Sequence, residues 1–248
     1  MIDKKSILGV GITNATQKEV LEYIVKSVEN FKKKHYVVTP NPEFLVLANK
    51  NPEFKNILNR ADLASNDGIG VLVAAKILGK SLKGRFTGVD LVESLCKEIV
   101  RKPITVGFLG GGAGVAERTA ECLRKKYPGL KVSFVGEKWP KDFSARNSNL
   151  TMEQFNNGAI DILFVAFGAP KQEIWISENL EKIPVKVAIG VGGAFDYISG
   201  RVQRAPGFIR NIGLEWLYRL VQEPWRIKRQ LSLLKFTWLV IKEKVSKN

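Results

Sequence analysis

Short apolar runs and amphipathic stretches alternate regularly along the first 200 residues of the chain. The apolar runs have the length of strands and predict strands at 6–12, 36–39, 61–65, 104–109, 130–135, 160–166 and 185–191. Amphipathic periodicity predicts helices between them, at 17–33, 42–50, 69–78, 89–101, 115–126, 152–156 and 171–180. Alternating strands and helices form a mainly parallel sheet, because each helix returns the chain to the same end of the sheet. We therefore expect an α/β fold with a Rossmann-like sheet covered by helices on both faces.

The pattern changes after Gly200, beyond which the sequence predicts no strand. Residues 201–248 hold 11 Lys and Arg against 3 Asp and Glu, so this last fifth carries about half of the net charge of +15. Apolar side chains beyond Pro224 recur at helical spacing and form one stripe, made up of Ile227, Leu231, Leu234, Trp238 and Ile241. A basic amphipathic helix with tryptophan is typical of a membrane surface, and packing on its own domain is the alternative. We expect a core at 1–200 and a membrane-associating helical appendage at 201–248.

Other function classes are disfavoured by what the chain contains. His35 is the only histidine, and Cys96 and Cys122 form no CxxC pair, so zinc chemistry and a Ser-His-Asp triad are excluded and both thiols are expected to be reduced. No apolar run approaches the roughly 20 residues that cross a bilayer, and the first residues lack a signal-peptide pattern. The sequence thus predicts neither a spanning nor an exported protein.

Glycine and polar residues gather where the predicted strands end. These loops are 39–42, 66–68, 110–112, 136–139, 168–172 and 192–196. Ligands of open α/β sheets bind beyond the carboxyl ends of the strands, where helix N-termini and backbone N–H groups converge. We expect these loops to line one crevice.

The glycine-rich loop Gly110–Gly114 has two interpretations. It follows a strand and opens a helix, so its N–H groups are placed to contact a diphosphate, although the same glycines also suit a tight turn. The loop does not read GxGxxG, but Glu137 ends the next strand where a ribose-binding acid is found in dinucleotide-binding folds. A nucleotide-cofactor oxidoreductase therefore stays open. A Walker A motif is absent.

Candidate catalytic groups follow from residue type and position. Asp67 precedes a predicted helix and is either its N-cap or a general base. The arginines of the C-terminal segment, Arg219, Arg226 and Arg229, suit phosphate oxygens, and solvated surface charge is the alternative. Since no loop contains Asp-x-Asp, we expect arginines rather than a metal ion to stabilise a leaving diphosphate.

Taken in order along the chain, these motifs resemble those of a known family. They are Thr39-Pro40-Asn41-Pro42-Glu43, Asn66-Asp67-Gly68-Ile69-Gly70, residues 84–91, Phe167-Gly168-Ala169-Pro170-Lys171-Gln172-Glu173, residues 190–196, Arg204-Ala205-Pro206 and residues 213–220. The set resembles the WecG/TagA/CpsF glycosyltransferase family from about residue 6 to 230.

The resemblance implies a metal-independent, inverting transfer of N-acetylmannosamine from its UDP donor to the 4-hydroxyl of N-acetylglucosamine on undecaprenyl diphosphate, in wall teichoic acid synthesis. It implies Asp67 as the base, with Thr39, Gln172, Arg219, Arg226 and Arg229 as further catalytic residues. Substrate-binding positions would be Asn41, Arg85, Gly110, Gly112, Trp139, Lys171 and Asp196, with Asp196 on the ribose and Trp139 on uracil. No cofactor is implied.

The same resemblance implies a peripheral protein on the cytoplasmic face of the cell membrane, bound to an anionic lipid surface. Relatives in the family use other sugars, so UDP-N-acetylmannosaminuronic acid is an alternative donor. A nucleic-acid-binding protein is the rival that the charge suggests, but segregation of charge to the Trp-bearing tail favours a membrane. Self-association through apolar positions such as Ile209, Ile212 and Leu220 stays open.

Overall fold

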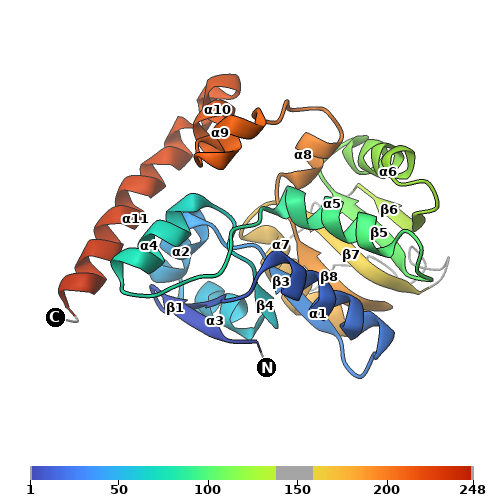
Figure 1. The fold of residues 1–248 in the computed structure, drawn as a ribbon, viewed down its shortest axis with the longest axis horizontal. Helices are drawn as coiled ribbons and strands as arrows, with labels where there is room; N and C mark the ends of the chain where they lie inside the picture. The colour runs from blue at the N-terminus through green and yellow to red at the C-terminus, as the bar shows by residue number, and fades with distance from the viewer. Residues whose placement is uncertain (1, 138–158, 247–248) are drawn as a thin grey trace. The chain divides into compact units, whose positions relative to one another are not determined.

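A computed structural model describes residues 2–137 and 159–246, with side chains at all of these positions except 228–230 (Figure 1). The predicted helix at 152–156 lies outside the described residues. The chain forms two compact units. Unit 1 consists of Met1–Val20, Val38–Thr87 and Val202–Asn248, and unit 2 consists of Leu21–Val37 and Gly88–Arg201.

The main sheet has six strands in the order β4-β3-β8-β7-β5-β6. Their bounds are β3 His35–Val38, β4 Leu63–Ala64, β5 Thr105–Gly110, β6 Lys131–Gly136, β7 Ile160–Ala166 and β8 Val185–Gly190. The pairs β3–β8, β8–β7, β7–β5 and β5–β6 are all parallel. The α/β fold with a parallel sheet is thus confirmed. Gly107 marks a shift of register between β5 and β6, where a Cβ would lie 3.0 Å from a Leu163 methyl group.

The central strands of unit 2 are buried along almost their whole length because helices cover them. These helices are α1 Gln17–Glu29, α5 Gly88–Ile99, α6 Val115–Lys126, α7 Lys171–Asn179, the short turn η2 Leu180–Lys182 and α8 Ala194–Ile198. Phe108 of β5 stacks on Phe164 of β7 with ring centroids 5.5 Å apart. Phe195 of α8 meets Phe108 edge-on at 5.7 Å. This aromatic contact fixes α8 to the sheet.

The first helix begins as predicted and ends earlier. Thr16 and Glu19 form the reciprocal capping box, with the Thr16 N–H donating to Glu19 Oε2 at 2.7 Å and the Glu19 N–H donating to Thr16 Oγ1 at 3.3 Å. The predicted end at residue 33 is wrong, because Lys34 Nζ donates to the carbonyl oxygens of Leu180, Glu181 and Ile183 and draws the chain toward β3. His35 begins β3, as predicted.

Unit 1 contains a feature that the sequence did not predict. The apolar run 6–12 is not one strand but parts of a hairpin, with β1 Lys4–Ile7 antiparallel to β2 Val10–Thr13. Leu8 and Gly9 both have positive φ, 51° and 79°, which suits the two central residues of a tight hairpin turn. Positive φ at a leucine is not encoded by residue type, so pattern alone could not place this turn.

Apart from the short strand β4, the other elements of unit 1 are helical. Its helices are α2 Pro42–Lys50, α3 Pro52–Arg60, α4 Ile69–Ile77, α9 Gly207–Asn211, α10 Glu215–Gln222, the turn η3 Pro224–Arg226 and α11 Ile227–Val245. Helix α3 was not predicted from the sequence; its N-cap Asn51 accepts from the Phe54 N–H at 3.0 Å. In Figure 1, α11 runs beside α2 and α4, which it contacts.

The two cysteines are free thiols. Cys96 is buried in α5, and burial raises its pKa to about 12, so it stays a neutral thiol at physiological pH. Cys122 is half-buried on α6.

Candidate active site

Backbone hydrogen bonds join the loops of unit 2 to neighbouring strands at the carboxyl ends of those strands. The Gly111 N–H donates to the Ala166 carbonyl oxygen at 3.0 Å, and the Val191 N–H donates to that of Val165 at 2.9 Å. Gly110 has a φ of 105°, and a Cβ there would lie within 3.0 Å of Ala166 backbone atoms. The close approach of the loops after β5 and β7 therefore requires glycine at this position.

Gln172, predicted to be catalytic, is fully buried on α7 and joins two of these loops. Its Oε1 accepts from the Gly168 N–H at 3.1 Å and from the Gly192 N–H at 3.0 Å. Its Nε2 donates to Glu173 Oε1 at 2.6 Å. The carboxamide thus clamps the loop after β7 to the loop after β8. Lys171, the first residue of α7, is exposed beside this clamp.

Glu173 is a functional candidate that the sequence analysis overlooked. Its carboxyl group is fully buried, and Oε2 has no hydrogen bond. Burial raises the pKa of Glu173 to about 8. A glutamate beside a glutamine at the start of a helix gives no sequence signal of burial, because first-turn acids are normally exposed.

Asp196, predicted to bind ribose, lies on α8 directly after the loop Val191–Gly193. Its carboxylate is 3.7 Å from Arg201 Nη1, which also donates to the Gly111 carbonyl oxygen at 3.4 Å. Gly112 lies beside the same guanidinium. Unit 2 thus brings Gly111, Gly112 and Asp196 together around Arg201, a residue that the sequence analysis did not select, and Gly110 precedes this group in the chain.

The N-terminus of α6 already holds a carboxylate. The Gly114 N–H donates to Glu137 Oε1, and Gly114 adopts a left-handed conformation at the N-cap. The pKa of Glu117 is raised, mainly by burial and further by Glu137. A second anion at this helix end would meet negative charge. The diphosphate contact predicted for Gly110 and Gly112 is therefore better placed toward Arg201 than at the start of α6.

In unit 1, Asp67 lies next to the Thr39-Pro40-Asn41 segment. The Ser65 N–H donates to the Val38 carbonyl oxygen at 2.8 Å, and the Asp67 N–H donates to that of Pro40 at 3.0 Å. These two bonds extend the pairing of the strands into the loops. Thr39 is buried, and Asp67 is half-buried.

The structure separates the two roles considered for Asp67. The N-cap of α4 is Gly68, with φ of 128°, and no side chain caps the helix. The N-cap interpretation is therefore wrong, because Gly68 stands between the aspartate and the first helical turn. The general-base interpretation stays a prediction. Asn41, by contrast, does cap α2: its Oδ1 accepts from the Glu43 N–H at 2.9 Å and the Phe44 N–H at 3.3 Å. Because Oδ1 already accepts these two bonds, the substrate contact predicted for Asn41 would be made by its Nδ2 atom.

Arg85 belongs to the same neighbourhood of unit 1. Asn66 holds the loop on which Arg85 lies: its Nδ2 donates to the Gly84 carbonyl oxygen at 3.1 Å, and its own carbonyl oxygen accepts from the Phe86 N–H at 3.1 Å. Arg85 Nη2 donates to the carbonyl oxygen of Arg210 in α9 at 3.0 Å. Arg85 therefore connects the Asp67 loop to the C-terminal helices.

Arg219 and Arg226 are brought together by a carboxylate. Glu223 Oε2 lies 2.5 Å from Arg219 Nε and 3.4 Å from Arg226 Nη1, and all three side chains are largely buried. Two guanidinium groups around one carboxylate leave a net positive charge, which suits an incoming phosphate. The surface-charge alternative does not describe these two arginines. Arg229 lies in α11, but its side chain and the whole of Trp139 are outside the described residues.

The C-terminal helices expose apolar side chains in quantity. On α11 the residues that pack inward are Phe236, Leu239 and Val240, whereas the predicted stripe of Ile227, Leu231, Leu234, Trp238 and Ile241 is more than half exposed at every position. Helix α11 is thus apolar on two faces. Helix α4 adds an exposed row at four-residue spacing, formed by Ile69, Val73 and Ile77.

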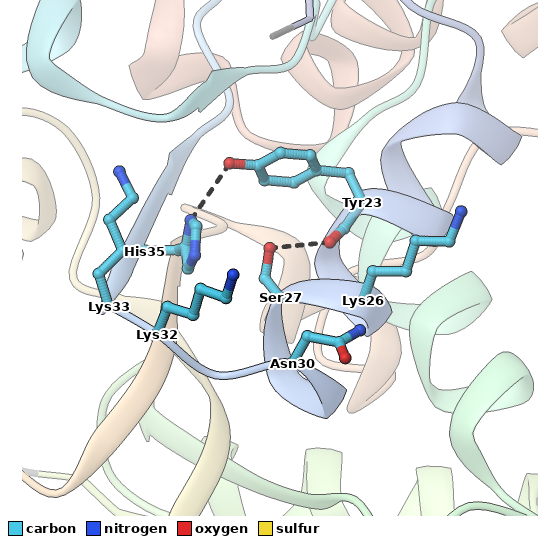
Figure 2. A pocket seen from close by; sticks show the side chains of 7 residues that line it. All are labelled: Tyr23, Lys26, Ser27, Asn30, Lys32, Lys33 and His35. Carbon is cyan, nitrogen blue, oxygen red and sulfur yellow. Dashed lines mark hydrogen bonds between the residues drawn. The ribbon is translucent and has the colours of Figure 1, made fainter.

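A pocket of about 460 Å³ lies elsewhere on unit 2, lined by Tyr23, Lys26, Ser27, Asn30, Lys32, Lys33 and His35 (Figure 2). Tyr23 Oη and His35 Nδ1 are 3.2 Å apart at its wall. His35 is the first residue of β3, which runs parallel to β8. The pocket therefore lies at the amino end of the sheet and is separate from the loops described above.

No helix in the part of the chain that the structure describes is long and apolar enough to cross a membrane.

Comparison with known proteins agrees with the motif order. A protein from Bacillus spizizenii is 36% identical over 207 residues, covering 84% of this chain and 79% of the relative. Proteins from Bacillus subtilis and Staphylococcus aureus are 30% identical over 243 residues and 31% identical over 242 residues, covering 98% and 97% of this chain and 93% of each relative. All three are named N-acetylglucosaminyldiphosphoundecaprenol N-acetyl-beta-D-mannosaminyltransferase.

The sequence pattern described as "Glycosyl transferase WecG/TagA/CpsF family" matches residues 5–248, nearly the whole chain. This extent decides between the two enzyme classes that the glycine-rich loop left open, in favour of a transferase over an oxidoreductase. The chain belongs to the WecG/TagA/CpsF family of glycosyltransferases.

Proposed function

We propose that the chain transfers N-acetylmannosamine from UDP-N-acetylmannosamine to the 4-hydroxyl of N-acetylglucosamine on undecaprenyl diphosphate, a step of wall teichoic acid synthesis. The observation that carries this proposal is the similarity, over as much as 98% of this chain, to three proteins that share one name and the activity it states. Their name specifies the acceptor and a beta-linked product, and we extend both to this chain.

In the proposed reaction Asp67 takes the proton of the acceptor hydroxyl. The hydroxyl oxygen forms a bond to C1 of N-acetylmannosamine as the bond from C1 to the UDP oxygen breaks, and UDP leaves with the electron pair. Attack from the face opposite UDP inverts the configuration at C1. Asp67 is half-buried, and its backbone is bonded to Pro40 in the Thr39-Pro40-Asn41 segment, which supports the role of base.

The positive charge for the leaving diphosphate is assigned to Arg219 and Arg226, with Arg229 beside them in the chain. The pair around Glu223 supports this assignment because two guanidinium groups offer more charge than one carboxylate neutralises. This role calls for no metal ion. In unit 2, Asp196 is proposed to bind ribose, and Lys171, Gly110 and Gly112 to contact the donor. Trp139 is kept as the proposed uracil contact.

We also place the protein on the cytoplasmic face of the cell membrane. The support is the exposed row on α11, which is the stripe from Ile227 to Ile241 described above. Further apolar side chains are exposed nearby in the sequence, all among basic residues: Phe208, Ile212, Val221 and Trp225. Apolar side chains that enter the lipid boundary beside Lys and Arg favour an anionic leaflet. A surface of this kind would keep the enzyme next to its lipid-linked acceptor.

The direct test is transfer by the purified protein from UDP-N-acetylmannosamine to a polyprenyl-diphosphate-linked N-acetylglucosamine, with UDP release and the disaccharide product both measured. We expect turnover with the beta-linked product, unchanged by a chelator. Turnover only with UDP-N-acetylmannosaminuronic acid would identify that sugar nucleotide as the donor instead. No turnover with either sugar nucleotide would refute the proposed activity.

A further inference from the structure

The buried carboxyl group of Glu173 has a neighbourhood that is unusual for an acid. It lies on α7 in unit 2, fully buried, and its Oε1 accepts from the Gln172 amide at 2.6 Å. An added Cβ on Gly190 would lie 3.0 Å from Glu173 Oε1 and 2.9 Å from Gln172 Nε2, so β8 passes close to both side chains. The reaction proposed above uses neither Glu173 nor this contact.

Hydrogen-bond chemistry fixes how the two side chains are oriented. The groups at Gly168 and Gly192 are N–H donors, so the Gln172 atom between them is the carbonyl oxygen. The Gln172 NH2 group must then point to Glu173, which accepts through Oε1. A carbonyl oxygen of a neutral carboxylic acid accepts this bond as a carboxylate would. Oε2 has no hydrogen bond, and an ionised oxygen left so in the interior would be strongly disfavoured.

We propose that Glu173 is a positioning residue: as a neutral acid it orients the Gln172 carboxamide, which locks the loops after β7 and β8 and thereby holds Asp196 in place for the uridine diphosphate part of the donor. The last clause rests on the proposed function. The locking of the loops rests on the contacts alone.

The connection from the clamp to Asp196 is short. Gly192, held by Gln172, is followed by Gly193 and then by α8, on which Asp196 is the third residue. Phe195 anchors the same helix on Phe108. With the helix anchored on one side and its preceding loop clamped on the other, the carboxylate of Asp196 is confined. Loss of the clamp removes one of these two restraints, so the carboxylate of Asp196 is held less closely.

Among the described residues, the phenol of Tyr36 on β3 is a titratable group that interacts with Glu173. Burial and the negative charge of Glu173 raise the pKa of Tyr36 well above 10, so Tyr36 stays neutral while Glu173 titrates. Ionisation of Glu173 near pH 8 would place an uncompensated charge beside Gln172. The clamp should therefore weaken in mildly alkaline solution.

The test uses the full chain and UDP as the probe, with the dissociation constant measured from pH 6.5 to 9.5. Glu173→Gln keeps a neutral acceptor of the same shape, Glu173→Leu keeps the apolar packing without the acceptor, and Glu178→Gln, at an exposed acid on the same helix, is the matched control. We expect the wild type and E178Q to lose about tenfold in UDP affinity at the alkaline end, E173Q to keep the neutral affinity across the range, and E173L to bind about tenfold more weakly throughout.

An alkaline loss in E173Q equal to that of the wild type, or normal UDP binding by E173L, would overturn the proposal. Amide hydrogen exchange gives a readout that does not involve UDP: the protection factors of the Gly168 and Gly192 amides should fall in E173L and be retained in E173Q. If the wild type fails to bind UDP at any pH while these protection factors change as expected, the donor assignment fails and the clamp stands. Unchanged protection factors in E173L would refute the clamp itself.

Discussion

The backbone N–H of Asp67 donates to the carbonyl oxygen of Pro40 at 3.0 Å, so a hydrogen bond joins the loops after β3 and β4 in unit 1. Because Gly68, not Asp67, is the N-cap of α4, the aspartate is not used to cap that helix. This relationship places the backbone of the proposed base next to the segment that contains the buried residue Thr39.

Replacement of the proposed base tests this arrangement most directly. Asp67→Asn keeps size and polarity but removes proton affinity, and we expect turnover to fall about 10²- to 10⁴-fold with UDP affinity unchanged. Asp62→Asn, a nearby half-buried acid in the same unit, is the control and should keep normal turnover. Steady-state UDP release measures both, and near-normal turnover by D67N would exclude Asp67 as the base.

The paired arginines make a second prediction. Arg219→Ala and Arg226→Ala should each lower kcat about 10²- to 10³-fold, since each removes a charged donor to the leaving diphosphate. Either variant leaves Glu223 paired with the other arginine, so the helix should remain folded by circular dichroism. Arg118→Ala, at an exposed arginine of α6, is the control. A rise in KM without a fall in kcat would show that the pair binds the ground state alone.

The buried acid predicts how stability depends on pH. The pKa of Glu173 is about 8 in the folded chain and 4.5 without burial, so the folded state holds the proton more tightly. Stability therefore falls as pH rises from about 4.5 to 8, and above that range the penalty is complete. Glu173→Gln should be as stable as the wild type at pH 4.5. At pH 9 its free energy of unfolding should be higher by on the order of a few kcal/mol, and its melting temperature should be higher as well.

Thermal unfolding scans at several pH values measure this difference, with Glu178→Gln as the control for loss of an acid. A difference between E173Q and the wild type that stays constant with pH would contradict the assignment.

Membrane binding makes a fourth prediction. Leu231→Ser with Leu234→Ser, on the exposed row of α11, should lower partition onto anionic vesicles about tenfold or more, because both side chains are more than 60% exposed and available to lipid. Phe31→Ser removes an exposed apolar side chain from unit 2 and should bind normally.

Truncation after Gly200 would be a poorer test, since it also uncovers the faces of α2 and α4 on which Phe236 and Val240 pack. Vesicle sedimentation of the point variants leaves that packing intact. Normal sedimentation of the double variant would contradict the assignment of this face to lipid.

Much of the fold could be predicted because it depends on local pattern. The buried runs of β5, β7 and β8 and the capping box of Thr16 and Glu19 are visible in the sequence, and the structure contains them. The hairpin turn at Leu8 was missed since its positive φ has no signature in residue type. Helix α11 shows another limit: periodicity identified an apolar stripe, but the face that packs inward is the other one, around Leu239.

The candidate site could be predicted in its motifs but not in its partners. Glu223 lies four residues after Arg219, a spacing that could have indicated the pair. Glu173 and Arg201 could not be found this way, because burial of the first and the contacts of the second with Asp196 and Gly111 arise only when distant segments meet. Tertiary contacts determine which loop residues bind ligand, so residue type alone does not identify them.

The two apolar faces of α11 have a consequence for work with the purified protein. Without lipid, the exposed row on α11 is a large apolar area in contact with water. Such areas tend to associate with other apolar surfaces, including those of a second copy of the same chain. Particle size measured in plain buffer will then report how well that row is shielded, and mild detergent should shift the distribution toward single chains.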